Sequence, residues 1–343
     1  MRELLNTLYV NTPNAYLASD GNNVKVIVDN ECVGQVPLIN FESIVTFGYS
    51  GASPSLMQKC LQQGIDISFI SPSGHFKGRV SGKPKGNVYL RRTQYRIADL
   101  EPISLSISQN FILGKVYNQR WMIERFIRDH SLQIDVEKFH AISKTLHDGL
   151  QSIQESKTMD ELRGIEGNLA TEYFSIFDDM IINQKDDFYY HGRSRRPPMD
   201  RVNAMLSLAY TLLASECASA LTANGLDPYV GFMHVDRPGR ESLALDLMEE
   251  LRGVVADRFV LKLINKKMIK ASDFLEKENG SFLLKDDARK LFLSEWQNNK
   301  FTEIMHPYIK EKVEWGLVPF VQAQLLARYL RGDLDAYPPF FWK

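Results

Sequence analysis

The pattern of hydrophobic and polar positions divides the chain into two regions. Over roughly the first hundred residues, short runs rich in β-branched and aromatic residues alternate with Gly, Pro, Asn and Asp, which is typical of strands joined by turns. The runs expected to form strands are TLYVNT, AYLASDGNNVKVIVDN with a hairpin turn at SDGNN, CVGQVPL, SIVTFG, DISFIS, FKGRVS and NVYLRRTQYR. The segment SPSLMQKCLQQG is expected to form a helix, capped by Ser53 or Ser55 and stopped by Gly64.

After DLEPISLS, apolar positions recur about every 3.6 residues and few helix breakers occur, which predicts helices. They are expected near 104–130, 136–154, 159–185, 198–223, 242–254, 257–266, 286–298 and 308–331. The two patterns together predict an α+β protein, with a small β-rich N-terminal domain at 1–100 and a larger all-α C-terminal domain at 101–343. The aromatic tail DAYPPFFWK either docks back on this domain or contacts a partner.

Composition limits the class of protein. The chain has 343 residues, 44% of them hydrophobic and 24% charged, as in soluble globular proteins of about two domains. Its three cysteines (Cys32, Cys60 and Cys217) form no CxxC pair, so neither a disulfide framework nor a cysteine zinc site is supported. No apolar run reaches about 18 residues and the N-terminus lacks a secretory pattern, so we expect a cytoplasmic protein without a membrane span.

Positive charge is concentrated in two clusters, although the formal net charge is only −1. Such clusters favour an anionic partner, most often nucleic acid, but Lys and Arg also protect exposed strand edges from aggregation. The first cluster, within 76–98, has no acidic residue and contains Lys77, Arg79, Lys83, Lys85, Arg91, Arg92 and Arg96. The second lies in the long polar loop 184–198 and just beyond it, and contains Arg193, Arg195, Arg196 and Arg201.

The stretch HVDRPGRESLALDLMEELR places His234 in a loop before a helix that carries three acidic residues. Leu243, Ala244, Leu247, Met248 and Leu251 are the expected core stripe of this helix. Asp246, Glu249 and Glu250 fall within one arc on the other side, where their repulsion requires either water or a cation. The stretch therefore fits either a metal site or a solvated acidic face behind a structural histidine.

Glu166 occupies an unexpected position in the helix that follows a capping box at Thr158 and Glu161. It heads a second stripe that continues through Ala170, Tyr173 and Phe177, so its carboxylate points toward packed surface, where an unpaired charge is costly. Gly164 and Gly167 flank it, which suggests that another backbone or a ligand approaches closely. The alternative is that Glu166 pairs with Arg163 or another arginine.

Glu166, His234 and Glu249, with Asp246 nearby, would form a site of carboxylates and one imidazole. Oxygen ligands suit Mg²⁺ or Mn²⁺, and the nitrogen ligand favours Mn²⁺. The chain has no HExxH, Walker loop, GxGxxG, GxSxG or CxxC motif, so zinc proteases, NTPases, dinucleotide enzymes and serine hydrolases lack support. A hard-metal site beside basic clusters indicates phosphodiester chemistry.

Four blocks of the sequence carry a resemblance to a known family. They are IEGNLATEYF (165–174), DRVNAMLSLAYTLL (200–213), LDPYVGFMH (226–234) and RPGRESLALDLMEELR (237–252). Taken in order, they resemble the signature blocks of CRISPR-associated protein one, the metal-dependent integrase and endonuclease of spacer acquisition. The resemblance spans the whole chain, and the tail YPPFFWK is similar to that of the subtype I-C branch.

The resemblance implies residues, cofactors and partners. It implies metal ligands at Glu166, His234 and Glu249, catalytic residues at these positions and at Asp246, and Mg²⁺ or Mn²⁺ as the cofactor. Many relatives have Asp where this chain has Glu249, which leaves open how Asp246 and Glu249 divide the coordination. The family inserts short double-stranded DNA, the spacer precursor, into a CRISPR repeat by attack of a 3′-hydroxyl. It acts as a homodimer, here through the β-rich domain, and in complex with the small CRISPR-associated protein two.

Several roles stay open at this stage. DNA contacts are expected from Arg91 and Arg92 and from the loop arginines Arg193, Arg195 and Arg196, although this loop could instead form a dimer contact. Tyr173 could orient substrate, but core packing is its expected role. The alternative to an integrase and nuclease is a non-catalytic DNA-binding scaffold whose carboxylates only solvate a helix face. A metal phosphohydrolase for small substrates is disfavoured by the arginine-rich loop.

Overall fold

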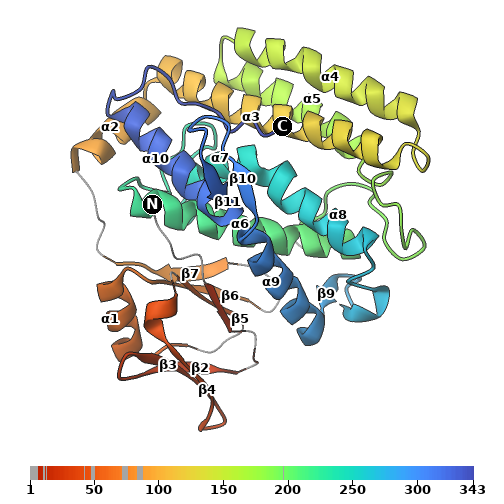
Figure 1. Cartoon of the computed structure of the whole chain (residues 1–343). Helices are drawn as coiled ribbons and strands as arrows, with labels where there is room; N and C mark the ends of the chain where they lie inside the picture. Colours follow the sequence, from red (N-terminus) through yellow and green to blue (C-terminus); the bar gives the residue numbers. More distant parts are fainter. Residues whose placement is uncertain are drawn as a thin grey trace.

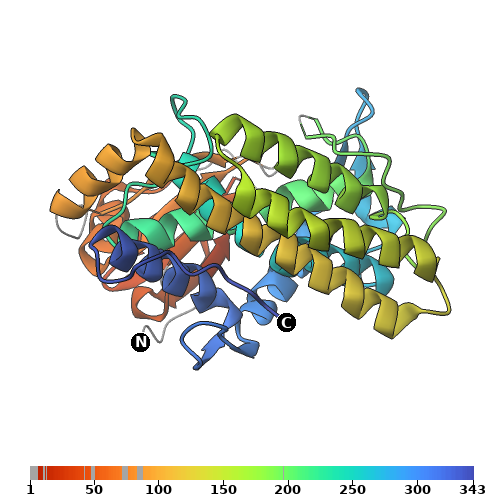
Figure 2. The same ribbon diagram turned by 90° about the horizontal axis from the view of Figure 1, so that it is seen from above.

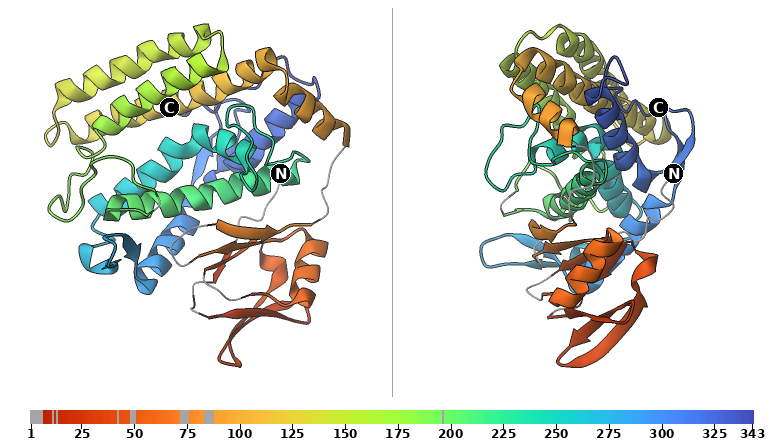
Figure 3. Two further views of the ribbon diagram at one scale, coloured as in Figure 1. Left: turned by 180° about the vertical axis from the view of Figure 1, so that it is seen from behind. Right: turned by 90° about the vertical axis from the view of Figure 1, so that its left-hand side faces the viewer.

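The fold consists of a β-rich end and a larger helical part (Figure 1). The computed structural model describes residues 7–10, 12, 14–41, 43–47, 51–71, 76–82, 88–195 and 197–343. Helices α3 (Glu101–His130), α4 (Val136–Glu155) and α5 (Met159–Ser175) run side by side as an outer layer (Figure 2). Helix α6 (Arg201–Ala223) lies between this layer and the β-rich end (Figure 3). The arrangement is the mixed α+β fold that the sequence predicts, with a β-rich N-terminal and a helical C-terminal region.

The described residues of the β-rich region form two sheets. A four-stranded sheet has the order β1-β5-β6-β7, with β1, β5 and β6 parallel and β7 antiparallel, and a three-stranded antiparallel sheet has the order β2-β3-β4. Helix α1 (Pro54–Gln63) is capped by Ser53, which accepts a hydrogen bond from the backbone of Leu56, and ends at Gly64 with a φ of 75°. The strands are β1 (Thr7–Val10), β2 (Tyr16–Asp20), β3 (Asn23–Val28), β4 (Glu31–Pro37), β5 (Ser43–Phe47), β6 (Asp66–Ile70) and β7 (Phe76–Val80).

The two faces of the four-stranded sheet pack against different partners. Successive side chains of a strand point to opposite faces. Ile44 accordingly belongs to a small core with α1 and the β2-β3-β4 sheet, whereas Val45 and Phe47 belong to the large core of the helices. The sheet is therefore shared between the two cores.

The helical region begins at α3, a long helix with Pro102 in its first turn. A π-helical turn, Arg252–Asp257, joins α7 and α8 without a break, although two separate helices are expected there. The helices are α2 (Val88–Ala98), α3 (Glu101–His130), α4 (Val136–Glu155), α5 (Met159–Ser175), α6 (Arg201–Ala223), α7 (Ser242–Leu251), α8 (Arg258–Asn265), α9 (Asp286–Lys300) and α10 (Val318–Leu330).

Several further expectations about secondary structure are wrong, and the helix expected over 159–185 already ends at Ser175. The run NVYLRRTQYR forms α2 instead of a strand, because Leu90 and Gln94, one helical turn apart, face the same interior and Gln94 binds the loop at Asp227. The second region is not all-α, since it contains the hairpins β8-β9 (Phe274–Glu276, Phe282–Leu284) and β10-β11 (Glu303–Met305, Lys312–Glu314). The helix expected from 308 therefore starts only at Val318.

Helix α6 is long and apolar enough to cross a membrane by length and composition alone. However, 67% of its most apolar 18-residue window is buried inside the fold, among the side chains of the large core. This burial is typical of the core helix of a soluble protein, and the helix gives only weak support for a membrane span.

Candidate active site

The carboxylates of Glu166 and Glu249 meet at one lysine ammonium. Glu166 projects from α5, Glu249 from α7 and Lys115 from the middle of α3. The Nζ atom of Lys115 forms an ion pair with Oε1 of Glu166 and lies 2.7 Å from Oε2 of Glu249. Lys115 and Glu249 are buried, and the side chain of Glu166 is 22% exposed. The two acidic residues predicted as ligands are thus neighbours at the edge of solvent.

Arg252 fixes the second oxygen of Glu249. Its Nη1 donates to Oε1 of Glu249 at 3.0 Å, and its guanidinium stacks 4.2 Å from the ring centre of Tyr210. Burial alone would raise the pKa of Glu249, but Lys115, Arg252 and His234 together hold it well below its usual range. Glu249 is therefore ionised at neutral pH, with Oε2 as the oxygen that lies beside the ammonium of Lys115.

Asp246 orients His234. The Oδ1 atom of Asp246 lies 2.6 Å from Nδ1 of His234 and accepts the backbone N–H of the same residue at 3.0 Å. Oδ2 accepts the backbone N–H groups of Phe232 at 2.7 Å and Met233 at 3.1 Å. Asp246 is fully buried, and its two oxygens are occupied by these four donors. It holds the loop and the imidazole, and no hydrogen bond of His234 Nε2 is found among the residues that the structure describes.

Arg163 does not pair with Glu166. It donates to Asp160 at 3.0 Å and to the backbone carbonyl of Met233 at 2.8 Å, so it joins α5 to the loop that carries His234. The alternative pairing with an arginine is wrong, because Lys115 is the partner of Glu166. The expected close approach of another backbone at the flanking glycines is also wrong: a Cβ atom at Gly164 or Gly167 would meet nothing within 4 Å.

The donor set fits a hard divalent cation, although no group of three or more His, Cys, Asp and Glu side chains in the described part of the chain has the spacing of a metal site. Lys115 lies between Glu166 and Glu249. Oε2 of Glu249 is buried and has no aligned hydrogen-bond donor among the described residues, despite the nearby ammonium. An ionised oxygen of this kind, beside a histidine whose Nδ1 is held by a carboxylate, is suited to Mg²⁺ or Mn²⁺.

The acidic face of α7 is not solvated. Asp246, Glu249 and Glu250 are all buried, which rules out the solvated-face interpretation. Glu250 accepts hydrogen bonds from Tyr337, from the backbone N–H of Phe340 at 2.6 Å and from Gln322 at 3.1 Å. The aromatic tail thus docks on the helical region. Burial raises the pKa of Glu250 to about 8 despite these donors.

Behind Arg252 lies a buried network around Asp257. Tyr210 donates to Oδ1 of Asp257, and Tyr173 donates to Oδ2 at 3.0 Å. Burial raises the pKa of Asp257 to about 6 against the influence of Arg252 and the two hydroxyls. Because Tyr173 is completely buried in this network, its role is structural.

The arginines predicted to contact DNA differ in their surroundings. Arg193 is half-buried and donates to Asn203 at 2.6 Å and to Ser207 at 3.1 Å, so it holds the loop against α6. Arg195 and Arg92 are exposed and Arg91 is half-buried. Arg91 and Arg92 lie on α2. Arg196, Lys83 and Lys85 lie outside the described residues.

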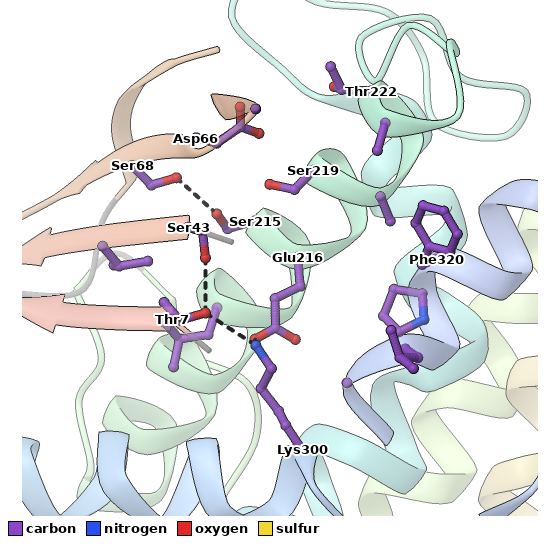
Figure 4. Close-up of a pocket in the computed structure, with 18 of the residues that line it drawn as sticks. Thr7, Ser43, Asp66, Ser68, Ser215, Glu216, Ser219, Thr222, Lys300 and Phe320 are labelled. Atoms are coloured by element: carbon purple, nitrogen blue, oxygen red, sulfur yellow. Dashed lines mark hydrogen bonds and ion pairs between the residues drawn. The ribbon is translucent and has the colours of Figure 1, made fainter. Parts of the chain in front are cut away.

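A cavity of about 480 Å³ lies elsewhere, between the four-stranded sheet and helices α6 and α10. Figure 4 shows Lys300 between Glu216 and Thr7, at distances of 3.4 Å and 3.2 Å from their oxygens. The lining shares no residue with the candidate metal site. Its polar contacts join the sheet to the helices.

Sequence reasoning missed Lys115 and Arg252. Lys115 had a detectable signal, since it interrupts the apolar run of FILGKV, where a charge requires a partner. Arg252 lies one turn after Glu249, a spacing that places the two side chains together on a helix. A buried and a half-buried carboxylate, two cations and a carboxylate-held histidine define a candidate metal-dependent nuclease of nucleic-acid phosphodiesters.

Comparison with known sequences supports this class. Residues 8–298 match the family described as CRISPR associated protein Cas1. The CRISPR-associated endonuclease Cas1 2 of Rhodospirillum rubrum is 46% identical over 347 aligned positions, which cover 100% of both chains. The CRISPR-associated endonuclease Cas1 1 of Chlorobaculum tepidum is 44% identical, again over 100% of both. The chain therefore belongs to the Cas1 family of CRISPR-associated endonucleases, as the four sequence blocks indicate.

Solved structures share the fold. A casposase bound to an integration product has a TM-score of 0.83 and 24% identity, over 98% of this chain and 93% of the casposase chain. A chain of a Cas6-RT-Cas1–Cas2 complex has a TM-score of 0.82 and 22% identity, over 98% of this chain and 36% of the other. The two-region architecture is therefore that of Cas1-type proteins.

Proposed function

We propose that this chain is a metal-dependent DNA endonuclease and integrase that inserts short foreign DNA into a CRISPR array. Glu166, His234 and Glu249 are the ligands of Mg²⁺ or Mn²⁺. The observation that carries the proposal is that carboxylates from two different helices meet at the ammonium of Lys115. Beside them lies a histidine held by Asp246. Membership of the Cas1 family supports the endonuclease activity, and the similarity to a casposase bound to an integration product supports the integrase reaction.

Each side chain has a defined task in this reaction. Bound Mg²⁺ or Mn²⁺ would polarise the scissile phosphate and lower the pKa of the attacking hydroxyl. Asp246 keeps the proton of His234 on Nδ1, so that Nε2 presents its lone pair. Arg252 holds Oε1 of Glu249 and leaves Oε2 as the ligand atom. The open space beside Gly164 and Gly167 gives DNA access to Glu166.

The reaction exchanges one phosphodiester for another. The 3′-oxygen of the incoming strand forms a bond to a repeat phosphorus atom, the bond from that phosphorus to the 3′-oxygen of the repeat strand breaks, and the leaving oxygen takes up a proton. When water is the nucleophile, the same steps give hydrolysis and endonuclease activity. One set of ligands is sufficient for both outcomes.

DNA and protein partners follow from the same proposal. Arg91, Arg92, Arg195 and Arg196 contact the DNA backbone, and Arg193 positions the loop of Arg195 and Arg196. The chain acts as a homodimer in the cytoplasm, with residues 1–100 as the dimerisation domain and residues 101–343 as the catalytic domain. It assembles with Cas2, as the related Cas6-RT-Cas1–Cas2 complex suggests. The tail YPPFFWK supports assignment to the subtype I-C branch.

Strand transfer by isosteric variants tests the proposal. Glu166→Gln and Glu249→Gln should reduce metal-dependent joining of labelled duplex DNA by about 100-fold or more, since several kcal/mol of charge stabilisation are lost. DNA binding in a gel-shift assay should remain. Glu172→Gln, on the same helix as Glu166, is the matched control. Wild-type joining by Glu166→Gln or Glu249→Gln contradicts the assignment.

A titration with Mn²⁺ separates this function from its alternatives. The integrase requires the metal for joining and cleavage, whereas a DNA-binding scaffold shows salt-dependent binding and no metal-dependent reaction. Cleavage of a small phosphodiester, with no joining of DNA, would instead support a metal phosphohydrolase. The assays should include Cas2, so that an inactive isolated chain does not decide the question.

A further inference from the structure

Lys115 occupies the position between the two carboxylates that form the core of the proposed metal site. Its ammonium contacts Glu166 and lies 2.7 Å from Glu249, and both contacts bring a positive charge to the place where a divalent cation is needed. Lys115 projects from α3, which carries none of the proposed ligands. It is therefore a cation supplied by a third helix.

The surroundings explain why a charged lysine is stable at this buried position. Its side chain is only 4% exposed, and a lone ammonium there would be strongly unfavourable. Burial would lower the pKa of Lys115, but Glu249 and Glu166 raise it above its usual value, so the ammonium stays protonated. In return, the ammonium cancels the repulsion between two carboxylates. Lys115 holds the site together in the protein without metal.

We propose that Lys115 is an internal counter-ion that competes with the divalent cation for Glu166 and Glu249 and must leave them when the metal binds. The proposal rests on the metal site of the proposed function. A divalent cation at the same two carboxylates repels the ammonium and takes its acceptors. Metal binding therefore includes the cost of displacing Lys115.

The geometry also determines which of the two cations moves. Arg252 binds the other oxygen of Glu249 and is stacked on Tyr210, so the metal can reach Oε2 without disturbing it. Lys115 contacts the ligand oxygen itself and has a flexible four-carbon stem. Its ammonium can rotate away from the carboxylates while Arg252 remains.

The displaced ammonium needs a new anionic partner. A phosphate oxygen of DNA bound beside Glu166 is such a partner, because this part of the site is open to solvent. DNA would then favour the displaced position of Lys115 and strengthen metal binding, and by linkage the metal would strengthen DNA binding equally. Lys115 thus couples the binding of the metal to the binding of DNA.

Mn²⁺ binding to the full chain tests the competition directly. Isothermal titration calorimetry without DNA should show Lys115→Met binding Mn²⁺ about tenfold or more tightly than wild type, within the usual range of coupling between sites. Lys300→Met removes another buried lysine, which pairs with Glu216 at 3.4 Å, and should leave the affinity unchanged. Lys115→Gln keeps a hydrogen-bond donor and repeats the measurement if Lys115→Met does not fold.

A second titration in the presence of a short DNA duplex tests the link to substrate. In wild type, DNA should lower the Mn²⁺ dissociation constant about fivefold or more. In Lys115→Met, this effect should disappear, because no ammonium has to be displaced.

The outcomes separate this proposal from the proposed function. If wild type binds Mn²⁺ and Glu166→Gln abolishes the binding, the metal site stands. In that case, folded Lys115→Met or Lys115→Gln that binds Mn²⁺ no more tightly than wild type overturns the role of Lys115. If wild type binds no Mn²⁺, or Glu166→Gln binds it normally, the metal site itself is wrong. A DNA effect that persists in Lys115→Met overturns the link to substrate.

Discussion

The carboxylate of Asp246 lies 2.6 Å from Nδ1 of His234 and also accepts the backbone N–H of the same residue. The same carboxylate accepts two further backbone N–H groups, from Phe232 and Met233. Asp246 is fully buried and both its oxygens accept hydrogen bonds, whereas Oε2 of Glu249 lies 2.7 Å from the ammonium of Lys115, which also contacts Glu166. This arrangement favours the proposal that Glu249 is the ligand and Asp246 positions the histidine.

Asp246→Asn should therefore lower Mn²⁺ affinity and DNA joining by about 10–100-fold, as expected for the partner of a metal-binding histidine. The amide retains one acceptor oxygen for the loop but loses the charge that fixes the histidine tautomer. Calorimetry and a joining assay provide the measurements. Asp236→Asn, in the exposed part of the same loop, is the control. Wild-type Mn²⁺ affinity in Asp246→Asn would show that the histidine needs no such partner.

Gly231→Ala should disturb the same loop from within. A Cβ atom at this position would lie 2.9 Å from Oδ2 of Asp246 and 3.0 Å from the backbone of Ser242, so the loop that carries His234 must shift. We expect a loss of about 1–3 kcal/mol in the free energy of unfolding and weaker Mn²⁺ binding. Urea denaturation and calorimetry measure the two effects. A Cβ atom at Gly34 would have no atom within 4 Å, so Gly34→Ala should change neither the stability nor the Mn²⁺ binding. Unchanged Mn²⁺ binding in Gly231→Ala would contradict the prediction.

The features that sequence predicted best are those set by local pattern. The core stripe from Leu243 to Leu251 is buried as expected, and Thr158 and Ser53 cap their helices through the hydrogen bonds that their motifs predict. These elements follow from residue periodicity and from side chains a few positions apart. Tertiary contact was not needed to predict them.

The features that sequence could not predict depend on distant contacts. The segment around Leu90 forms a helix because its partners come from α3, α10 and the loop at Asp227. Glu166 was singled out as a charge facing packed surface, but its partner Lys115 lies 51 positions away on another helix. Glu250 was grouped with Glu249, yet it holds the C-terminal tail. Periodicity predicts on which face of a helix or strand a residue lies, but it does not predict which distant residue the side chain contacts.

The docked tail should contribute to stability through Tyr337. Its hydroxyl donates to Oε1 of Glu250 and accepts a hydrogen bond from Gln322 at 2.7 Å, and all three groups are buried. Tyr337→Phe leaves buried polar groups without a partner and should lower the free energy of unfolding by about 1–3 kcal/mol. Tyr329→Phe, at a partly exposed tyrosine of α10, should change it by less than about 0.5 kcal/mol. Equal stabilities of the two variants in urea denaturation would show that the tail contact is energetically neutral.

His306 should make the protein less stable in mild acid. It is completely buried beside Phe340, and burial lowers the pKa of its imidazole to about 4. The neutral ring accepts the backbone N–H of Tyr308 at Nδ1, an acceptor that protonation removes. Because the folded-state pKa lies below the unfolded value of about 6.5, this contribution to stability is complete above pH 6.5 and is lost as the pH falls toward 4.

Between pH 7 and pH 5 the loss from this group should be about 2 kcal/mol. Urea denaturation at both pH values should show the loss in wild type and a smaller one in His306→Gln, which keeps an acceptor but does not titrate; an equal loss in both proteins would assign the acid sensitivity to other groups.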